Sequence, residues 1–283
     1  MQKFGLVVDS TTFLDQELFE KMDIEVVSLS VTIDQDTYKG VDIDDEFVKS
    51  RLSSAKKMHS SAPSPGDFVV AYENLIAKGY KDIAVIPISI GLSSTHQSAL
   101  MAIDILDRSD INIVVIDTLQ SNVGLRTLIM TFVDEILAGM EFEQFIIEAR
   151  VRVANTRLQF TVQDLKQLYN TGRLKILSLL AAEILRMKPI IEMVDGKLEN
   201  VAKPITIRGV FDAFVNSIKT ITDKGKNLFI TVVSIGKNSL VEPLLEKFKE
   251  AFPYATFDHI EQINPVYVLS LGNKGIGFAA TAY

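Results

Sequence analysis

Short apolar runs rich in β-branched residues alternate with amphipathic segments through the first half of the chain. Such continuous runs favour strands buried on both faces, and they occupy residues 4–8, 25–33, 83–89 and 111–117. The segments between them favour helices, because their apolar residues recur at a spacing of three and four. The clearest example is Phe68, Ala71, Tyr72, Leu75 and Ile76. The alternation predicts an α/β fold whose sheet is mostly parallel and carries helices on both faces.

Hydroxyl side chains mark where the predicted helices begin. Ser64 precedes Pro65 and is followed three residues later by Asp67, which predicts a capped helix start with proline at its first position. The same spacing recurs in two other pairs, Thr12 with Asp15 and Ser94 with Gln97. We expect these junctions at the carboxyl edge of the sheet, where open α/β folds bind ligands.

The pattern changes after a long helical region at residues 121–156. Strands are predicted at 158–162, 188–205, 227–235, 255–263 and 265–271. Asp195-Gly196 lies between two alternating runs and predicts a hairpin turn. We therefore expect an N-terminal α/β domain over residues 1–155 and a C-terminal α/β domain with a mixed sheet over 156–283.

Composition and charge limit the kinds of molecule that we expect the chain to bind. The chain has 283 residues, 47% of them hydrophobic, no cysteine and a formal net charge of -7. Its length allows two domains with a sizeable interior. The negative charge argues against nucleic acid as a partner, and the lack of cysteine excludes thiol nucleophiles and thiolate metal sites.

The apolar stretches are too short or too interrupted for targeting or membrane spans. Asp9 breaks the first run before it reaches the length of a secretory signal, so we expect a cytoplasmic protein. The most apolar stretch, 174–191, contains Glu183, Arg186 and Lys188, which argues against a membrane crossing. Peripheral membrane contact stays open.

Common catalytic motifs are absent from the sequence. There is no Walker A motif, dinucleotide-binding glycine pattern, nucleophile elbow or zinc-protease helix. The three histidines, at 59, 96 and 259, do not have metal-ligand spacing. Ser93 and His96 lie three residues apart, but no third catalytic group can be assigned to them. We therefore predict neither a catalytic residue nor a metal site.

A surplus of hydroxyls at the loop-to-helix junctions is the strongest chemical signal. They form three groups: Ser10 to Thr12; Ser60, Ser61 and Ser64; and Ser93 to Thr95. A helix cap accounts for one residue in each group. The others suit capture of a small anion such as a carboxylate, although turns stabilised by Ser and Thr explain them equally well.

The order of motifs along the whole chain resembles the DegV family of bacterial fatty-acid-binding proteins. The matching segments are VVDSTTFL, YKGVDIDDEF, SSAPSPGDF, PISIGLSSTHQSA, DTLQSNVGL, LYNTGRLK, KPIIEMVDGKL and NPVYVLSLGNKGIGF. The resemblance implies two α/β domains with a lipid tunnel between them, occupied by a long-chain fatty acid. It further implies a carrier without a cofactor or activity of its own, which presents the acid to a fatty acid kinase.

The resemblance also assigns roles to individual residues. The fatty-acid carboxylate would be held by Ser60, Ser61, Ser93, Ser94 and Ser270. The tunnel would be lined by Phe68, Ile88, Leu92, Phe160, Leu168, Leu180, Ile184 and Met187. A partner would dock at Arg173 and Arg208.

The chain departs from the family pattern at several of these positions. Ser60 replaces a threonine and Ser270 replaces a histidine, so the cradle would keep neutral hydroxyl donors. Ile205 stands where an arginine is common, with Arg208 three residues on. Two other functions stay open: a transferase domain related to dihydroxyacetone kinases, and a sensor of another apolar lipid.

Overall fold

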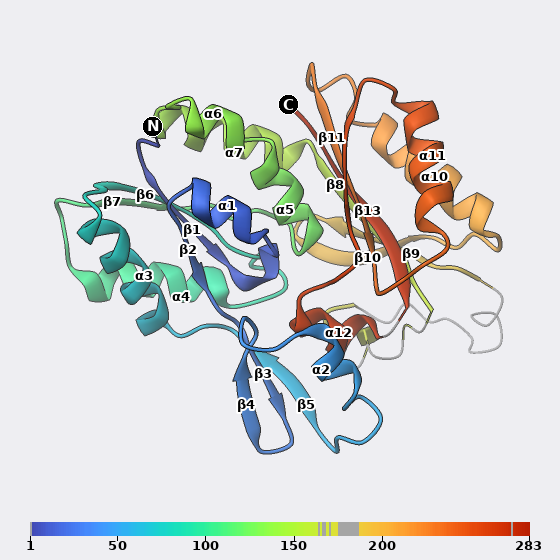
Figure 1. Cartoon of the computed structure of the whole chain (residues 1–283), viewed down its shortest axis with the longest axis horizontal. Helices are drawn as coiled ribbons and strands as arrows, with labels where there is room; N and C mark the ends of the chain where they lie inside the picture. The colour runs from blue at the N-terminus through green and yellow to red at the C-terminus, as the bar shows by residue number, and fades with distance from the viewer. Residues whose placement is uncertain (1, 164, 166–167, 170, 175–186, 273) are drawn as a thin grey trace.

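The computed structural model describes the chain apart from residues 1, 164, 166–167, 170, 175–186 and 273 (Figure 1). A four-stranded and a six-stranded sheet lie side by side, and a three-stranded sheet projects below them. The predicted α/β class is confirmed. The domain boundary after residue 155 stays a prediction.

The four-stranded sheet is parallel throughout, in the order β2-β1-β6-β7. Its strands are β1 (Gly5–Asp9), β2 (Ile24–Val27), β6 (Asp82–Ile86) and β7 (Asn112–Val115). Successive residues of β1 face opposite sides: Leu6 and Val8 join one apolar cluster, and Val7 joins another. The sheet is therefore buried on both faces, which explains its continuous apolar runs.

Helices cover both faces of this sheet. One face carries α3 (Pro65–Ala77) and α4 (Thr95–Leu106), and the other carries α5 (Val123–Met130), α6 (Val133–Leu137) and α7 (Phe142–Ala154). The short helices η1 (Ser10–Thr12) and α1 (Gln16–Lys21) follow β1. The predicted start of α3 is confirmed, because the Ser64 hydroxyl accepts from the Asp67 amide and the Asp67 carboxylate accepts from the Ser64 amide.

The six-stranded sheet is mixed, in the order β10-β9-β8-β13-β11-β12. Its strands are β8 (Thr156–Val162), β9 (Ile190–Val194), β10 (Lys197–Ala202), β11 (Leu228–Ser234), β12 (Thr256–Ile260) and β13 (Gly275–Ala282). The predicted hairpin joins β9 to β10, with Asp195 and Gly196 at φ 45° and 76°. The helices α10 (Ile207–Lys219) and α11 (Val241–Ala251) cover its outer face.

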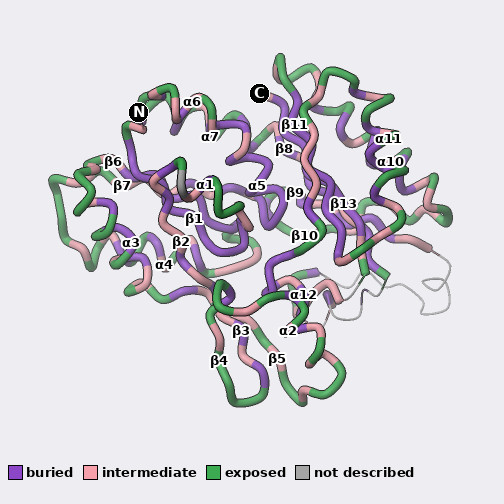
Figure 2. The backbone as a smooth tube through the Cα atoms, viewed as in Figure 1, coloured by how far each residue is buried: buried purple, intermediate pink, exposed green. Residues whose placement is uncertain are grey.

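Helix α5 lies between the two large sheets, and its residues 123–129 are all buried (Figure 2). Leu125 and Leu128 pack under the four-stranded sheet, and the Thr127 hydroxyl donates to the Thr231 hydroxyl of β11 at 2.8 Å. The Arg126 guanidinium donates to the Asp258 carboxylate of β12 at 2.8 Å, to the Asp15 carboxylate and to the Phe13 carbonyl. One buried helix therefore joins both sheets.

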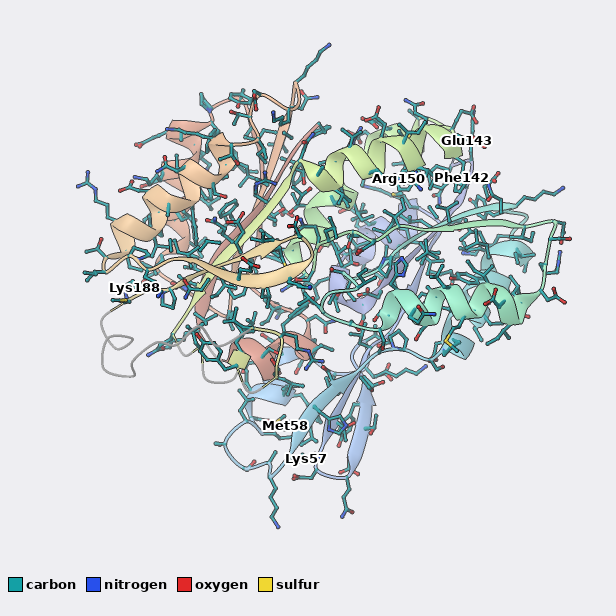
Figure 3. All side chains as sticks on the ribbon, turned by 180° about the vertical axis from the view of Figure 1, so that it is seen from behind. Lys57, Met58, Phe142, Glu143, Arg150 and Lys188 are labelled. Carbon is teal, nitrogen blue, oxygen red and sulfur yellow. The ribbon has the colours of Figure 1, made fainter. Side chains whose placement is uncertain are left out.

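The three-stranded sheet is antiparallel and consists of β3 (Ser30–Ile33), β4 (Asp36–Lys39) and β5 (Met58–Ser61). Helix α2 (Asp45–Lys49) links β4 to β5. Lys57 and Met58 lie on this projecting part (Figure 3). The opposite end of β5 points back toward the two large sheets, which brings Ser60 and Ser61 to them.

Several predicted elements differ from the structure. Residues 265–271 form a helix, α12 (Pro265–Leu271), because Pro265 occupies its first turn and the Asn264 side chain caps it. Residues 25–33 form β2 and β3 in two different sheets, separated where the Leu29 amide donates to the Ser10 hydroxyl. Neither Thr12 nor Ser94 caps a helix through its side chain, and β13 was not predicted.

Replacing Arg126 by methionine should lower the free energy of unfolding by about 3 kcal/mol, because it leaves Asp258 and two other acceptors without their cation. Urea unfolding followed by circular dichroism measures this loss. The matched control is Arg108→Met, which breaks an exposed pair with Asp110 and should leave the midpoint almost unchanged. Equal midpoints for the two variants would contradict the linking role of Arg126.

Candidate functional site

A cavity lies where the three sheets meet α12 and the start of α5. Its empty volume is about 950 Å³, including the part that opens to solvent. Its described wall consists mainly of apolar side chains from β8, β11 and α12. The lining includes Leu29, Ile88, Leu92, Val123, Leu158, Phe160, Val162, Leu168, Val233, Ile263, Val266 and Leu271.

Four of the five serines predicted to hold a carboxylate line this cavity: Ser60, Ser61, Ser93 and Ser270. Ser60 and Ser61 lie on β5 opposite Val31 and Ser30, and Ser270 lies on α12. The side chains of Ser60, Ser61 and Ser270 have no hydrogen-bond partner within the described parts of the chain. Their hydroxyls are therefore available to a ligand.

Ser93 and Ser94 differ in their surroundings. The Ser93 hydroxyl lies 2.8 Å from the Thr95 hydroxyl and accepts weakly from the Thr95 amide at 3.3 Å. Ser93 therefore combines a capping role with a place in the cavity wall. Ser94 is exposed and does not line the cavity.

The loop that carries Leu92 and Ser93 is held against the β9–β10 hairpin. The Ser89 hydroxyl donates to the Gly196 carbonyl at 2.8 Å and accepts from the Gly91 amide at 3.1 Å. A Cβ atom at Gly91 would overlap the Gly196 carbonyl. Glycine at 91 therefore allows the two loops to close one side of the cavity.

The Asp9 carboxylate holds the start of the same loop through a hydrogen bond. Its carboxylate is buried and accepts from the Ile88 amide at 2.5 Å and from the Thr11 amide at 2.8 Å. Burial raises the pKa of the Asp9 carboxyl, while the hydrogen bonds from Thr11 and Ile88 act in the opposite direction. Asp9 orders the end of β1 and does not itself line the cavity.

A second polar group contributes Ser121 and Asn122, which are buried, and Tyr267, which is partly buried, to the wall. The Asn122 amide donates to the Tyr267 hydroxyl at 3.1 Å, and the Asn122 side-chain oxygen is buried without a partner among the described residues. Sequence reasoning missed this group. A signal was present, since Ser121 and Asn122 closely follow the carboxyl end of a predicted parallel strand, where ligands bind.

The two arginines predicted to dock a partner lie in different places. Arg173 is exposed, lines the cavity and donates to the Thr171 carbonyl at 2.9 Å. Among the described lining residues it is the only charged one. Arg208 is exposed in the first turn of α10 and does not line the cavity.

Four of the eight residues predicted to line a tunnel lie at the cavity. Ile88, Leu92, Phe160 and Leu168 line the cavity. Phe68 instead packs between α3 and the four-stranded sheet, because it points down the buried face of that helix. Met187 is not among the cavity's lining residues. Leu180 and Ile184 lie outside the described residues.

No group of three or more His, Asp or Glu side chains that could hold a metal occurs in the part of the chain that is described. The Ser93 hydroxyl bonds to Thr95, and no hydrogen bond joins it to His96 within the described residues. No helix of the described structure is long and apolar enough to cross a membrane.

Comparison with known proteins identifies the family. A family model described as "Uncharacterised protein, DegV family" matches residues 3–282. The chain belongs to the DegV family. Two DegV domain-containing proteins of Staphylococcus aureus are 26% and 29% identical to it over 278 residues. The first alignment covers 97% of this chain and 96% of the relative, and the second covers 98% of each.

Solved DegV structures share the fold. A stearic-acid-binding protein from Eubacterium ventriosum matches with a TM-score of 0.85 at 25% identity, covering 99% of this chain and 98% of the other. A DegV family protein from Thermus thermophilus, described by its fatty acid binding, matches with a TM-score of 0.85 at 21% identity over the full length of both chains. DegV of Bacillus subtilis, described as a fatty acid binding protein, gives 0.84 at 22% over both full lengths.

Replacing Gly91 by alanine should push the loop away from the hairpin and destabilise the protein by about 1–3 kcal/mol, because the added methyl group overlaps backbone. Thermal unfolding measures this effect. Gly66→Ala is the matched control, since its nearest neighbour would be the Ser64 hydroxyl at 3.6 Å. If the two variants unfold alike, the loops do not depend on this close approach.

Proposed function

We propose that this DegV protein binds a long-chain fatty acid, with the acyl chain in the apolar cavity and the carboxylate at the serines. The observation that carries the proposal is one cavity with an apolar wall and three hydroxyls, of Ser60, Ser61 and Ser270, that lack partners in the described structure. The stearic-acid-binding relative from Eubacterium ventriosum, which has the same fold, supports it.

Burial of the acyl chain would supply most of the affinity. Each methylene removed from water gains about 0.8 kcal/mol, so a chain of about sixteen carbons gains on the order of 10 kcal/mol before the costs of association. Hydrogen bonds to the carboxylate add about 1.5–3 kcal/mol each, because the acceptor is charged. The hydroxyls would therefore fix the position of the head group.

The proposed cradle holds an anion with neutral donors. Ser60, Ser61, Ser93 and Ser270 can each donate one hydrogen bond to a carboxylate oxygen. Arg173 lines the cavity from an exposed position and would bring positive charge to its entrance. This arrangement explains how a chain of net charge -7 can bind an anion.

We further propose that the protein is a carrier which presents the bound acid to a fatty acid kinase, as the family resemblance implies. The kinase would phosphorylate the carboxylate, and this chain would perform no chemistry. Arg173 would contact that partner beside the carboxylate. Arg208, on α10, would form a separate contact.

Native mass spectrometry of protein purified from bacteria tests ligand binding. We expect a mass increase equal to one long-chain fatty acid, and binding of added acids with 14 to 18 carbons once the protein has been delipidated. Absence of both a co-purified acyl chain and binding of added acid would contradict the proposal.

The double variant Ser60→Ala, Ser93→Ala should weaken fatty-acid binding by about tenfold for each hydroxyl, because each loses a hydrogen bond to a charged group. Displacement of a fluorescent fatty acid measures the affinity. Ser64→Ala is the matched control on the same loop: it removes the cap of α3, so it should cost about 1 kcal/mol of stability and leave the affinity unchanged. Unchanged affinity in the double variant would remove these serines from the site.

A further inference from the structure

We propose that Ser121, Asn122 and Tyr267 form an internal recognition site for a hydroxyl group on the acyl chain, so that the preferred ligands are hydroxy fatty acids. This inference rests on the proposed fatty-acid binding and names the class of acid. The three side chains line the same cavity as the serines of the cradle. They differ from those serines in burial and in charge environment.

Burial places this polar group within the wall. Ser121 and Asn122 are 4% and 6% exposed, whereas Ser60, Ser93 and Ser270 are partly exposed and Ser61 is exposed. A carboxylate held by the exposed serines would place the acyl chain along the buried wall. The buried amide would then face the chain and not the head group.

The Asn122 side chain has hydrogen-bonding capacity that the described residues do not use. The Asn122 side-chain oxygen is buried with no partner among the described residues, whereas the Ser121 side chain contacts the Met193 sulfur at 4.0 Å and is hydrogen-bonded to the Tyr267 hydroxyl. Sulfur is a weak acceptor. A buried acceptor without a donor is destabilising, so a ligand hydroxyl that donates to the Asn122 oxygen would satisfy a group that a plain hydrocarbon chain leaves unpaired.

The backbone conformation at Asn122 also supports a functional role for this residue. Its φ of 46° and ψ of -123° lie in a region that side chains rarely adopt and that glycine adopts without strain. Strain of this kind is concentrated at functional sites, where the surrounding structure holds it in place. Asparagine at this position therefore destabilises the fold through its backbone conformation and also through its unpaired side-chain oxygen.

The charge environment selects a neutral oxygen group. Burial, followed by the nearby Asp9 carboxylate, raises the pKa of the Tyr267 hydroxyl, which therefore stays neutral. The same buried carboxylate disfavours a second anion beside Tyr267. A hydroxyl group fits, whereas the far carboxylate of a dicarboxylic acid does not.

The test compares stearic acid with a series of hydroxystearic acids whose hydroxyl occupies successive positions along the chain. Delipidated wild-type protein should bind one positional isomer at least tenfold more tightly than stearic acid in a displacement assay. A site built to hydrogen-bond an oxygen discriminates strongly against the analogue that lacks it. Binding of stearic acid with no preference for any isomer would overturn this inference and leave the proposed function standing.

The variant Asn122→Gly removes the amide and relieves the backbone strain, so it should fold at least as stably as wild type. We expect it to lose the preference for the hydroxylated isomer, so that the ratio of its affinities for that isomer and for stearic acid falls toward one. Asp107→Gly is the matched control, because Asp107 also has a positive φ, of 48°, but is exposed at the end of α4. It should keep the preference.

The outcomes separate the two proposals. A preference that persists in Asn122→Gly would overturn the role of this residue. Failure of wild-type protein to bind either stearic acid or any hydroxystearic acid would overturn the proposed function together with this inference. A crystal structure with the preferred isomer should place the ligand hydroxyl within hydrogen-bond distance of Asn122 or Ser121.

Discussion

The burial of α5 between two sheets is the constraint on which the rest of the structure depends. A helix that no water reaches must satisfy its polar side chains with partners from the elements around it. Arg126 and Thr127 do so by reaching β12 and β11 in the six-stranded sheet, while neighbouring leucines pack under the four-stranded sheet. The helix thus fixes how the two sheets meet, and the cavity forms along that junction.

The burial of α5 also explains why polar groups near the cavity entrance and polar groups within its wall differ in their free-energy cost. Near the entrance, serines can exchange their hydrogen bonds with water when no ligand is present, so they cost little. At the buried start of α5, Asn122 has no such exchange and its oxygen stays unpaired in the described structure. A polar group without a protein partner therefore costs less free energy at the entrance than inside the wall, although both kinds of group line the same cavity.

Some local signals predicted the structure correctly, although the caps expected at Thr12 and Ser94 did not form. The cap at Ser64 and the turn at Asp195-Gly196 are both confirmed. Residues 265–271 show the limit: their buried positions include Val266, Val268 and Leu269, and a short apolar run does not distinguish a strand from a buried helix. The strand β13 was missed because its glycines and alanines suit close packing between two strands and lack the β-branched pattern.

The site residues show the same difference between features that local sequence decides and features that the whole fold decides. The serines could be found because hydroxyls recur at the loop-to-helix junctions and the resemblance to the DegV family assigned five of them to the carboxylate; four of the five line the cavity. Tyr267 could not, since its place depends on α12 packing against the start of α5, a contact between distant parts of the chain. Phe68 had the right apolar character, but which face of α3 it occupies relative to the cavity is decided by the whole fold.

The three-stranded sheet has a dynamic consequence. Its strand β4 is mostly exposed and β5 alternates between half-buried and exposed residues, so this sheet contributes few side chains to the core. Regions with few buried contacts open at a lower free energy than the whole protein unfolds. Because Ser60 and Ser61 sit at its inner end, local opening of this one small sheet would uncover the cavity while α5 and both large sheets stay folded.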